Sequence, residues 1–332
     1  MTGSAIAGIL LVLLAGAMNG SFAAPMKWTR EWAWENTWFA WSSIALLFFP
    51  VLLAFATVPS LGDIYAQANP RVLVLVLASG AAWGVSQVLF GLGISRAGVA
   101  LGFAIVVGLA AAVGSLLPLL ISPAASGQGT RGAIGGVAVV LVGVGLCAYA
   151  GSSKEPSGRA AKAALSGILL CVAAGIGGAM INVGMVWGAP LTDAAQARGA
   201  AAVNQTNAVW LPLLAAGFIA TSVYCFALLS RNGTWSRFRD PALRRYWLLA
   251  LAMAICWFGS VELYGIAAAG LGPLGPVLGW PMFLSASIIT ANIWGIATGE
   301  WKQAAAGARR LMLAGVSVLV AAIFVIGIAG KV

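Results

Sequence analysis

Long apolar stretches alternate with short polar connections along the whole chain. Ten of these stretches each have about the twenty residues with which an α-helix crosses a bilayer. They cover approximately residues 4–24, 37–58, 71–94, 97–121, 131–151, 164–188, 206–229, 245–268, 273–298 and 310–329. The pattern predicts an all-α polytopic membrane protein with ten transmembrane helices. The connections at 95–96 and 269–272 are so short that the helices they join should form tight hairpins.

The composition identifies lipid as the main solvent of the chain. Of its 332 residues, 61% are hydrophobic and only 8% are charged, whereas soluble chains carry about 25% charged residues. Too little polar surface is therefore present to cover a globule in water. The basic residues that give the chain its net charge of +10 lie mainly in the connections between apolar stretches. This placement predicts contact with anionic membrane lipid rather than with nucleic acid, which would need a polar domain.

The basic residues are divided unequally between the two sets of connections. Fourteen of the 18 Lys and Arg residues lie in the odd-numbered connections, and four lie in the even-numbered ones and at the C-terminus. Because cytoplasmic loops carry the excess of positive charge, both termini are predicted to be periplasmic or extracellular in a bacterial inner membrane. Met1–Ala24 has no basic residue before its apolar core, so it is read as a permanent helix rather than a signal peptide.

Two internal matches indicate a repeat. The sequence Gly-Ile-Leu-Leu at Gly8 recurs at Gly167, 159 residues later. In a second match, seven positions correspond in order to seven others that lie 174 residues later. The first set is Trp83, Ser86, Leu89, Phe90, Gly91, Leu92 and Gly98, and the second set is Trp257, Ser260, Leu263, Tyr264, Gly265, Ile266 and Gly272. The matches align helix one with six, and helices three and four with eight and nine. Chance similarity among helices rich in Gly, Ala and Leu is the alternative explanation.

The repeat predicts two halves of opposite orientation. The first five-helix repeat is predicted at 1–151, a cytoplasmic connection at 152–163, and the second repeat at 164–332. Five is an odd number, so the second half enters the membrane in the opposite sense. Inverted repeats are typical of secondary transporters, in which two halves exchange conformations around a central site.

Few side chains are suited to catalysis or metal binding. The chain has no His, and its four Cys residues lie in apolar stretches without a paired spacing, as small buried side chains do. We therefore expect no metal, no cofactor and no catalytic residue. A membrane-embedded enzyme or accessory subunit is the alternative from another class, and it would need several ionisable residues at one membrane face. Glu262 is the one ionisable residue well inside an apolar stretch.

Polar and aromatic residues inside the stretches are the candidates for a binding site, because each is costly in hydrocarbon unless it is paired or faces water. Amides bind the hydroxyls of a sugar, and aromatic rings cover its apolar face. The predicted substrate-binding residues are Asn19, Trp83, Gln87, Asn182, Asn207, Trp257, Tyr264, Trp280 and Asn292. Glu262 is predicted to carry the coupling proton; a neutral glutamic acid bonded to a neighbouring helix is the alternative. Tryptophans nearer the helix ends are predicted interfacial anchors: Trp28, Trp32, Trp34, Trp38, Trp235 and Trp301.

Several motifs resemble one known family. They are Ala24-Pro25-Met26-Lys27 with Trp32-Ala33-Trp34-Glu35-x-x-Trp38, Gly80-Ala81-Ala82-Trp83-Gly84, Phe90-Gly91-Leu92, Gly279-Trp280, and Glu300-Trp301 with Arg309-Arg310. Together they resemble the L-rhamnose–proton symporter family of the drug/metabolite transporter superfamily. The resemblance implies ten helices in two inverted halves, a central cavity lined mainly by helices one, three, four, six, eight and nine, and proton-driven sugar uptake.

The sequence thus predicts a secondary transporter and not an enzyme. Its expected activity is proton-coupled uptake of a monosaccharide by alternating access. The expected substrate is a hexose or a deoxyhexose such as L-rhamnose or L-fucose. A transporter of the same fold for a nucleoside, an amino acid or a drug is the alternative. The expected partners are the sugar, a proton and membrane lipid.

Overall fold

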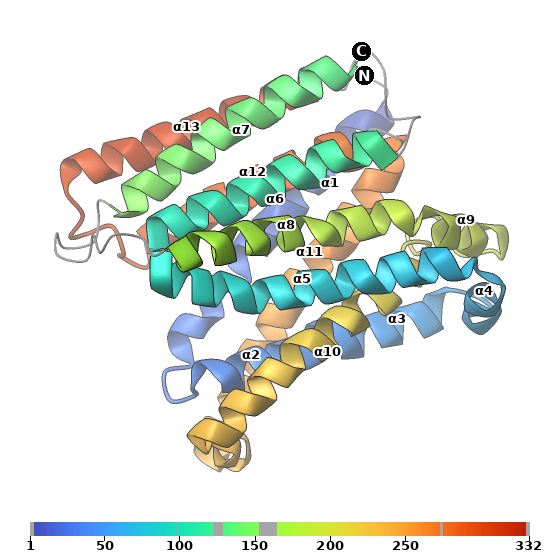
Figure 1. The fold of residues 1–332 in the computed structure, drawn as a ribbon, viewed down its shortest axis with the longest axis horizontal. Helices are drawn as coiled ribbons and strands as arrows, with labels where there is room; N and C mark the ends of the chain where they lie inside the picture. The colour runs from blue at the N-terminus through green and yellow to red at the C-terminus, as the bar shows by residue number, and fades with distance from the viewer. Residues whose placement is uncertain (1–2, 98, 122–128, 153–164, 273–274, 330–332) are drawn as a thin grey trace.

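The computed structural model describes residues 3–97, 99–121, 129–152, 165–272 and 275–329, and within these ranges every element is a helix (Figure 1). Ten helical segments in them are long and apolar enough to cross a membrane. They are α1 (Gly3–Ser21), α2 (Trp34–Ser42) continued by α3 (Phe49–Thr57), α5 (Pro70–Ala97), α6 (Val99–Ile121), α7 (Gly129–Ser152), α8 (Leu165–Trp187), α10 (Asn207–Asn232), α11 (Arg245–Gly270), α12 (Gly275–Ala297) and α13 (Ala306–Ala329). The predicted all-α protein with ten transmembrane helices is confirmed. The predicted connection 152–163 lies, apart from Ser152, outside the described residues.

The second transmembrane segment is interrupted, which the apolar pattern did not indicate. Between α2 and α3, residues Ser43–Phe48 form a wide π-helical turn, in which the N–H of Phe49 donates to the carbonyl of Ile44. Pro50 follows at the start of α3. A proline ring clashes with the carbonyl four residues earlier and supplies no N–H, so the wider turn accommodates it without breaking the segment.

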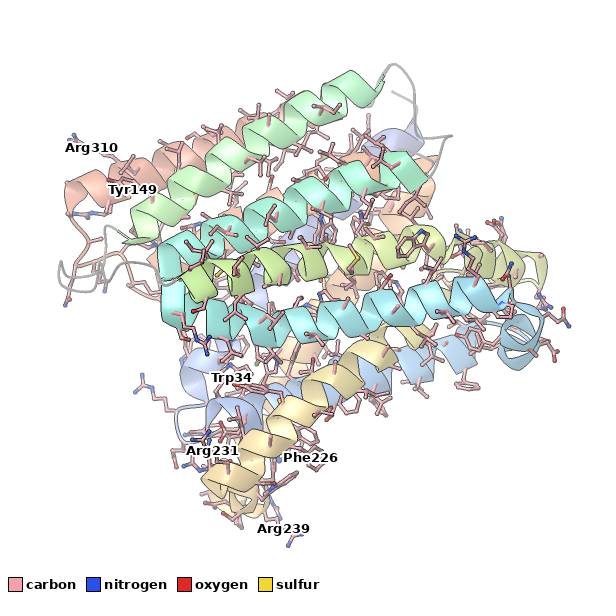
Figure 2. All side chains as sticks on the ribbon, in the orientation of Figure 1. Trp34, Tyr149, Phe226, Arg231, Arg239 and Arg310 are labelled. Atoms are coloured by element: carbon pink, nitrogen blue, oxygen red, sulfur yellow. The ribbon has the colours of Figure 1, made fainter. Side chains whose placement is uncertain are left out.

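Short helices that the sequence analysis missed lie in the connections. They are η1 (Ala24–Trp28), α4 (Leu61–Gln67), α9 (Ala189–Ala197), η4 (Thr234–Arg239) and η5 (Pro241–Leu243). Figure 1 shows α4 and α9 at the end of the bundle where α1 begins and α13 ends. The labelled arginines Arg231, Arg239 and Arg310 lie at the opposite end (Figure 2). The beginning of α1 and the end of α13 thus lie on one side, as ten crossings require; which side faces the cytoplasm stays a prediction.

Six helices surround the centre of the bundle. α8 packs against α5 and α6, and α1 packs against α11 and α12. On the periphery, α7 pairs with α13, and α10 packs against α5 and against α2 and α3. Large apolar side chains such as Phe55, Val223 and Phe324 are exposed on the outer helix faces. Lipid covers such surfaces in a membrane protein.

Glycine allows the closest contacts between these helices. A Cβ atom added to Gly80 on α5 would lie 1.9 Å from the carbonyl oxygen of Leu213 on α10, and one added to Gly84 would lie 2.4 Å from that of Gly217. Because apolar side chains gain little by leaving lipid for another helix, such close backbone packing holds the helices together.

Gly80→Ala should therefore destabilise the protein, since its methyl group has no space beside the Leu213 carbonyl. We expect a cost of about 1–3 kcal/mol, the usual range for overpacking, seen as a lower midpoint of thermal unfolding in detergent. Gly145→Ala on α7 is the matched control, because a Cβ atom there meets nothing within 4 Å. Equal midpoints for the two variants would contradict this account of the packing.

Candidate functional site

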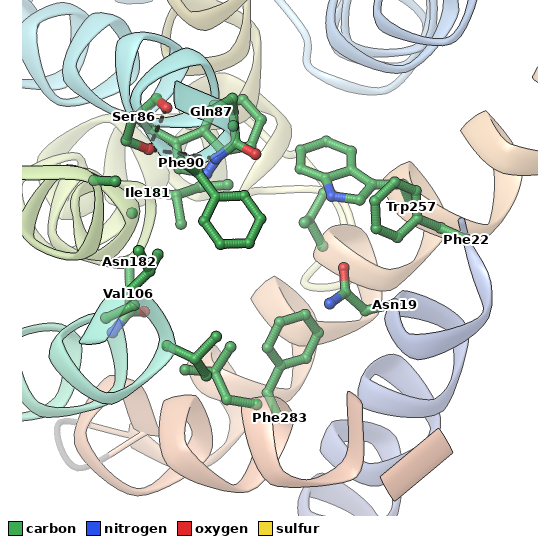
Figure 3. Close-up of a pocket in the computed structure, with 18 of the residues that line it drawn as sticks. Asn19, Phe22, Ser86, Gln87, Phe90, Val106, Ile181, Asn182, Trp257 and Phe283 are labelled. Atoms are coloured by element: carbon green, nitrogen blue, oxygen red, sulfur yellow. Dashed lines mark hydrogen bonds between the residues drawn. The ribbon is translucent and has the colours of Figure 1, made fainter. Parts of the chain in front are cut away.

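A cavity of about 520 Å³ lies in the centre of the bundle. This volume is within the range of about 300–1,000 Å³ that is usual for small-molecule sites. Aromatic side chains make up nearly half of its lining residues, and they come from six helices and from the turn after α1; Figure 3 shows Phe22, Phe90, Trp257 and Phe283 among them. The rings belong to Phe22, Trp34, Trp38, Trp41, Trp83, Phe90, Phe103, Trp210, Trp257, Tyr264, Trp280 and Phe283.

Contacts between rings fix the shape of this wall. Trp83 on α5 and Trp257 on α11 lie 5.2 Å apart between ring centroids, and Trp41 meets Trp257 edge-on at 5.4 Å. Trp280 on α12 stacks on Phe283, and its indole N–H donates to the carbonyl of Ala110 on α6 at 2.8 Å. Rings held in this way present flat apolar faces to the cavity, which suit the C–H face of a cyclic ligand.

Three amides enter the cavity from three different helices. Figure 3 shows the side chains of Asn19 on α1, Gln87 on α5 and Asn182 on α8 around the same space. Asn19 Nδ2 donates to Ser287 Oγ at 3.1 Å, and Gln87 Nε2 donates to Ser86 Oγ at 3.3 Å. Asn19 and Gln87 each retain hydrogen-bonding groups for a ligand, because a primary amide has two donors and an acceptor with two lone pairs.

Two indole groups of the wall have an unused donor. The N–H groups of Trp41 and Trp210 are buried and have no hydrogen-bond partner among the described residues. Both side chains are only 1% exposed, and both line the cavity. A buried donor without a partner costs about 1–3 kcal/mol, so an oxygen of a bound ligand at either N–H would recover part of this cost.

Asn182 and Tyr264 close one end of the cavity. Tyr264 Oη donates to Asn182 Oδ1 in a short hydrogen bond. Asn182 Nδ2 donates to the carbonyl of Gly114 at 2.7 Å and to that of Pro276 at 3.2 Å. The single amide therefore joins α8 to α6, α11 and α12. Both side chains are at most 2% exposed, so this end of the cavity is sealed by polar groups that are satisfied within the protein.

The structure brings seven of the nine predicted substrate-binding residues together around this cavity. They are Asn19, Trp83, Gln87, Asn182, Trp257, Tyr264 and Trp280. Asn207 and Asn292 are not among the residues that line it. Asn292 Nδ2 donates to the carbonyl of Ile288 in its own helix at 2.9 Å, and Asn207 faces α3. The seven residues therefore remain candidates for binding a ligand in this cavity, and the other two bond groups of the protein elsewhere.

Sequence reasoning missed one side of the wall. Trp34 and Trp38, which were predicted as interfacial anchors, line the cavity together with Trp41. Trp34 and Trp38 stack with ring centroids 5.2 Å apart, and Trp38 lies 4.6 Å from Trp41. A signal was available, since spacings of four and three residues place all three tryptophans on one face of a helix.

Glu262, the predicted proton carrier, lies outside the central cavity in a polar triad with Asn207 and Thr57. In one orientation of the Asn207 amide, its nitrogen points toward α11 and donates to both carboxyl oxygens of Glu262, at 2.5 and 3.2 Å. In the same orientation, Asn207 Oδ1 accepts from Thr57 Oγ1 at 3.0 Å. With the amide reversed, Asn207 Nδ2 donates to Thr57 Oγ1 at 3.0 Å and its oxygen faces Glu262. The first arrangement fits a carboxylate. The second fits a neutral carboxylic acid, which can donate to the amide oxygen.

No group of three or more His, Cys, Asp or Glu side chains that could hold a metal ion occurs in the part of the chain that the structure describes. The four Cys residues are free, and three of them are buried. The chemistry of this cavity is therefore that of amides, indoles and aromatic faces.

The family of the chain follows from comparison with known proteins. The sequence model of the L-rhamnose-proton symport protein family matches residues 1–331. The L-rhamnose-proton symporter of Citrobacter koseri is 26% identical over 98% of each chain. Those of Salmonella paratyphi B and Salmonella newport are 26% identical over 99% of each chain. The resemblance seen in the short motifs is confirmed: the chain belongs to the L-rhamnose–proton symporter family.

Proposed function

We propose that this protein is a secondary active transporter that imports a monosaccharide together with a proton across a bacterial inner membrane. The central cavity with its aromatic wall and its three amides carries this proposal. Relatives that match nearly the whole chain are L-rhamnose-proton symporters, so L-rhamnose is the first substrate to test. L-fucose and other hexoses or deoxyhexoses follow, because their rings offer the same groups.

The cavity is suited to a sugar in each of its parts. A pyranose ring has an apolar C–H face, which the Trp83 and Trp257 rings can cover. Its hydroxyls both donate and accept, so they match the amides of Asn19 and Gln87 and the unpartnered N–H of Trp41. None of the described side chains that line the cavity is charged. A neutral polyol therefore fits better than an amino acid or a charged metabolite, which would need a counter-ion there.

Local contacts support two inverted repeats. A Cβ atom on Gly16 of α1 would lie 2.6 Å from the backbone of Phe283, and one on Gly175 of α8 would lie 2.7 Å from Leu109. The two glycines are 159 residues apart and their partners are 174 apart, which are the two spacings of the sequence matches. The same holds for Gly8 beside Leu271 and Gly167 beside Ala97. Equivalent glycines thus have equivalent neighbours.

The pair of central tryptophans supports alternating access. Trp83 and Trp257 occupy equivalent positions of the repeat, and each is followed by a serine whose hydroxyl donates to the tryptophan carbonyl at 2.6 Å. Two equivalent residues of an inverted repeat can touch only near the axis that relates its halves. Their ring centroids lie 5.2 Å apart, which supports a sugar site near this axis, where an exchange of conformations would open it to either side.

The triad of Glu262, Asn207 and Thr57 supports the assignment of the coupling proton. An ionised Glu262 would accept from the Asn207 amide nitrogen, and a neutral Glu262 would instead donate to the amide oxygen, with the nitrogen then facing Thr57 at the end of α3. Uptake of one proton thus reverses the hydrogen bonds between α11, α10 and α3. Since α11 also carries Trp257 and Tyr264, the proton and the sugar act on the same helix.

Asn19→Ala should weaken L-rhamnose binding about tenfold, as expected for the loss of one or two hydrogen bonds to a ligand. Equilibrium binding of radiolabelled L-rhamnose to the purified protein measures this. Asn292→Ala removes the same amide from a helix face outside the cavity, and we expect near-normal binding. Equal affinities for the two variants would exclude this cavity as the sugar site.

Glu262→Gln should abolish uphill accumulation of L-rhamnose and spare exchange of the sugar across the membrane. The amide cannot release a proton, but it preserves the volume and a hydrogen bond to Asn207. Proteoliposomes with an imposed pH gradient measure accumulation, and counterflow without a gradient measures exchange. Asp63→Asn, an exposed carboxylate on α4, is the control and should accumulate sugar normally. Normal accumulation by Glu262→Gln would refute the assignment.

The proposed orientation can be tested with single cysteines in a chain whose four native Cys residues are replaced. Cysteine at the exposed Gly62 of α4 should react with a membrane-impermeant maleimide in intact cells, and cysteine at the exposed Ser236 of η4 only after permeabilisation. The two positions lie in connections of opposite parity. Labelling of both from the same side would contradict the crossing pattern, and the reverse result would invert the orientation.

A further inference from the structure

A second cavity, of about 620 Å³, lies beyond the Asn182–Tyr264 pair. It is formed by the ends of α6 and α8, by α9, by the turn before α10, and by the end of α11 and the beginning of α12. The proposed orientation puts this end outside the cell. We call this space the outer cavity. Asn182 and Tyr264 line both cavities, so the two spaces are separated by the thickness of one hydrogen-bonded pair.

The lining of the outer cavity is more polar than that of the central one. Thr192, Asp193 and Gln196 reach it from α9, and Gln205 and Thr206 reach it from the turn before α10. Asp193 and Gln196 are exposed, whereas Thr206 is 3% exposed. The polar groups therefore extend from solvent down to the buried floor of the cavity.

Two polar atoms at the floor have no partner. Thr206 Oγ1 and Gln205 Oε1 are buried and lack a hydrogen bond within the described residues. The unpartnered N–H of Trp210, which lines the central cavity, lies near Thr206, because a Cβ atom on Gly265 would lie 3.0 Å from Trp210 Nε1 and 3.3 Å from Thr206 Oγ1. Buried polar groups without a hydrogen bond are rare, because such a group costs free energy. A ligand with hydroxyls can both donate to and accept from them.

The geometry points to a second sugar-binding site in the outer cavity, in which the hydroxyls of a monosaccharide bond Thr206, Gln205 and the side chains of α9. This inference rests on the proposed function, and it concerns the same substrate on its way to the central cavity. Among the lining residues that the structure describes, Asp193 is the one with a charged side chain. A lone carboxylate suits the hydroxyls of a neutral sugar, whereas a divalent cation would need more charged ligands.

The outer site should bind more weakly than the central one. Tyr264 is the one aromatic residue of its described lining, against twelve in the central cavity. A sugar there gains hydrogen bonds but little ring stacking. Tighter binding beyond the Asn182–Tyr264 pair then draws the sugar inward once that pair opens.

Thr206→Val tests this site with little risk to folding. The hydroxyl has no partner to lose, so valine should leave the thermal midpoint unchanged or raise it. Equilibrium binding of radiolabelled L-rhamnose should give two classes of site for the wild type. Thr206→Val should lose the weaker class, and Asn19→Ala should weaken the tighter one. In vesicles, Thr206→Val should raise the half-saturating external concentration about three- to tenfold.

Thr221→Val is the matched control, since Thr221 Oγ1 is equally buried and unpartnered but lines neither cavity. Its binding should equal that of the wild type. The inference of a second site would be overturned if the wild type had one class of site, or if Thr206→Val still had two. If Asn19→Ala nevertheless weakened binding, the proposed function would stand without the second site. Absence of any sugar binding would refute both. Stabilisation of the sugar-free protein by sodium chloride but not choline chloride, lost in Thr206→Val, would show a cation site instead.

Discussion

Asn182 connects the centre of this protein because its one amide bonds groups on three other helices. It accepts from Tyr264 on α11 and donates to carbonyls of α6 and α12 at 2.7 and 3.2 Å. Inside a bilayer no bulk water replaces such partners, so the helices can part only by exchanging these bonds for others. A sugar carries hydroxyls that can take the place of each partner in turn. In the proposed transport cycle, a bound sugar would therefore lower the cost of parting Asn182 from Tyr264.

The proposed equivalence of the two halves bears on how easily the protein would exchange the two states of an alternating-access cycle. When Gly16 and Gly175 have equivalent neighbours, exchanging the conformations of the halves replaces each contact by one of the same kind. Two such states differ little in free energy, so a modest difference in ligand binding is enough to shift their populations. Glu262 breaks this equivalence, because Val88 stands at the matching position of the first half. A charge present in one half alone can favour one of two otherwise similar states.

The membrane explains which parts of the structure could be predicted from the sequence. Hydrocarbon thickness fixes the length of each apolar stretch, so all ten crossings were found. The π-helical turn before Pro50 and the short α4 and α9 leave no mark in that pattern. Amides inside the apolar stretches were identified as candidates. Length and hydropathy, however, do not tell whether the helix face that carries an amide is turned toward a cavity or toward another helix. Asn19 and Asn292 looked alike in the sequence, yet one enters the cavity and the other bonds its own helix.

If Glu262 carries the coupling proton, as proposed, its separation from the central cavity constrains how coupling can work. A carboxylate inside the cavity would bond the sugar directly, and proton and sugar would then compete for the same atoms. Here Glu262 bonds Asn207, and the cavity residues Trp257 and Tyr264 stand on another face of the same α11. Proton and sugar would then be coupled through the position of α11, because each ligand would stabilise one of its positions. Such coupling is reciprocal: whatever the proton adds to sugar affinity, the sugar adds to proton affinity.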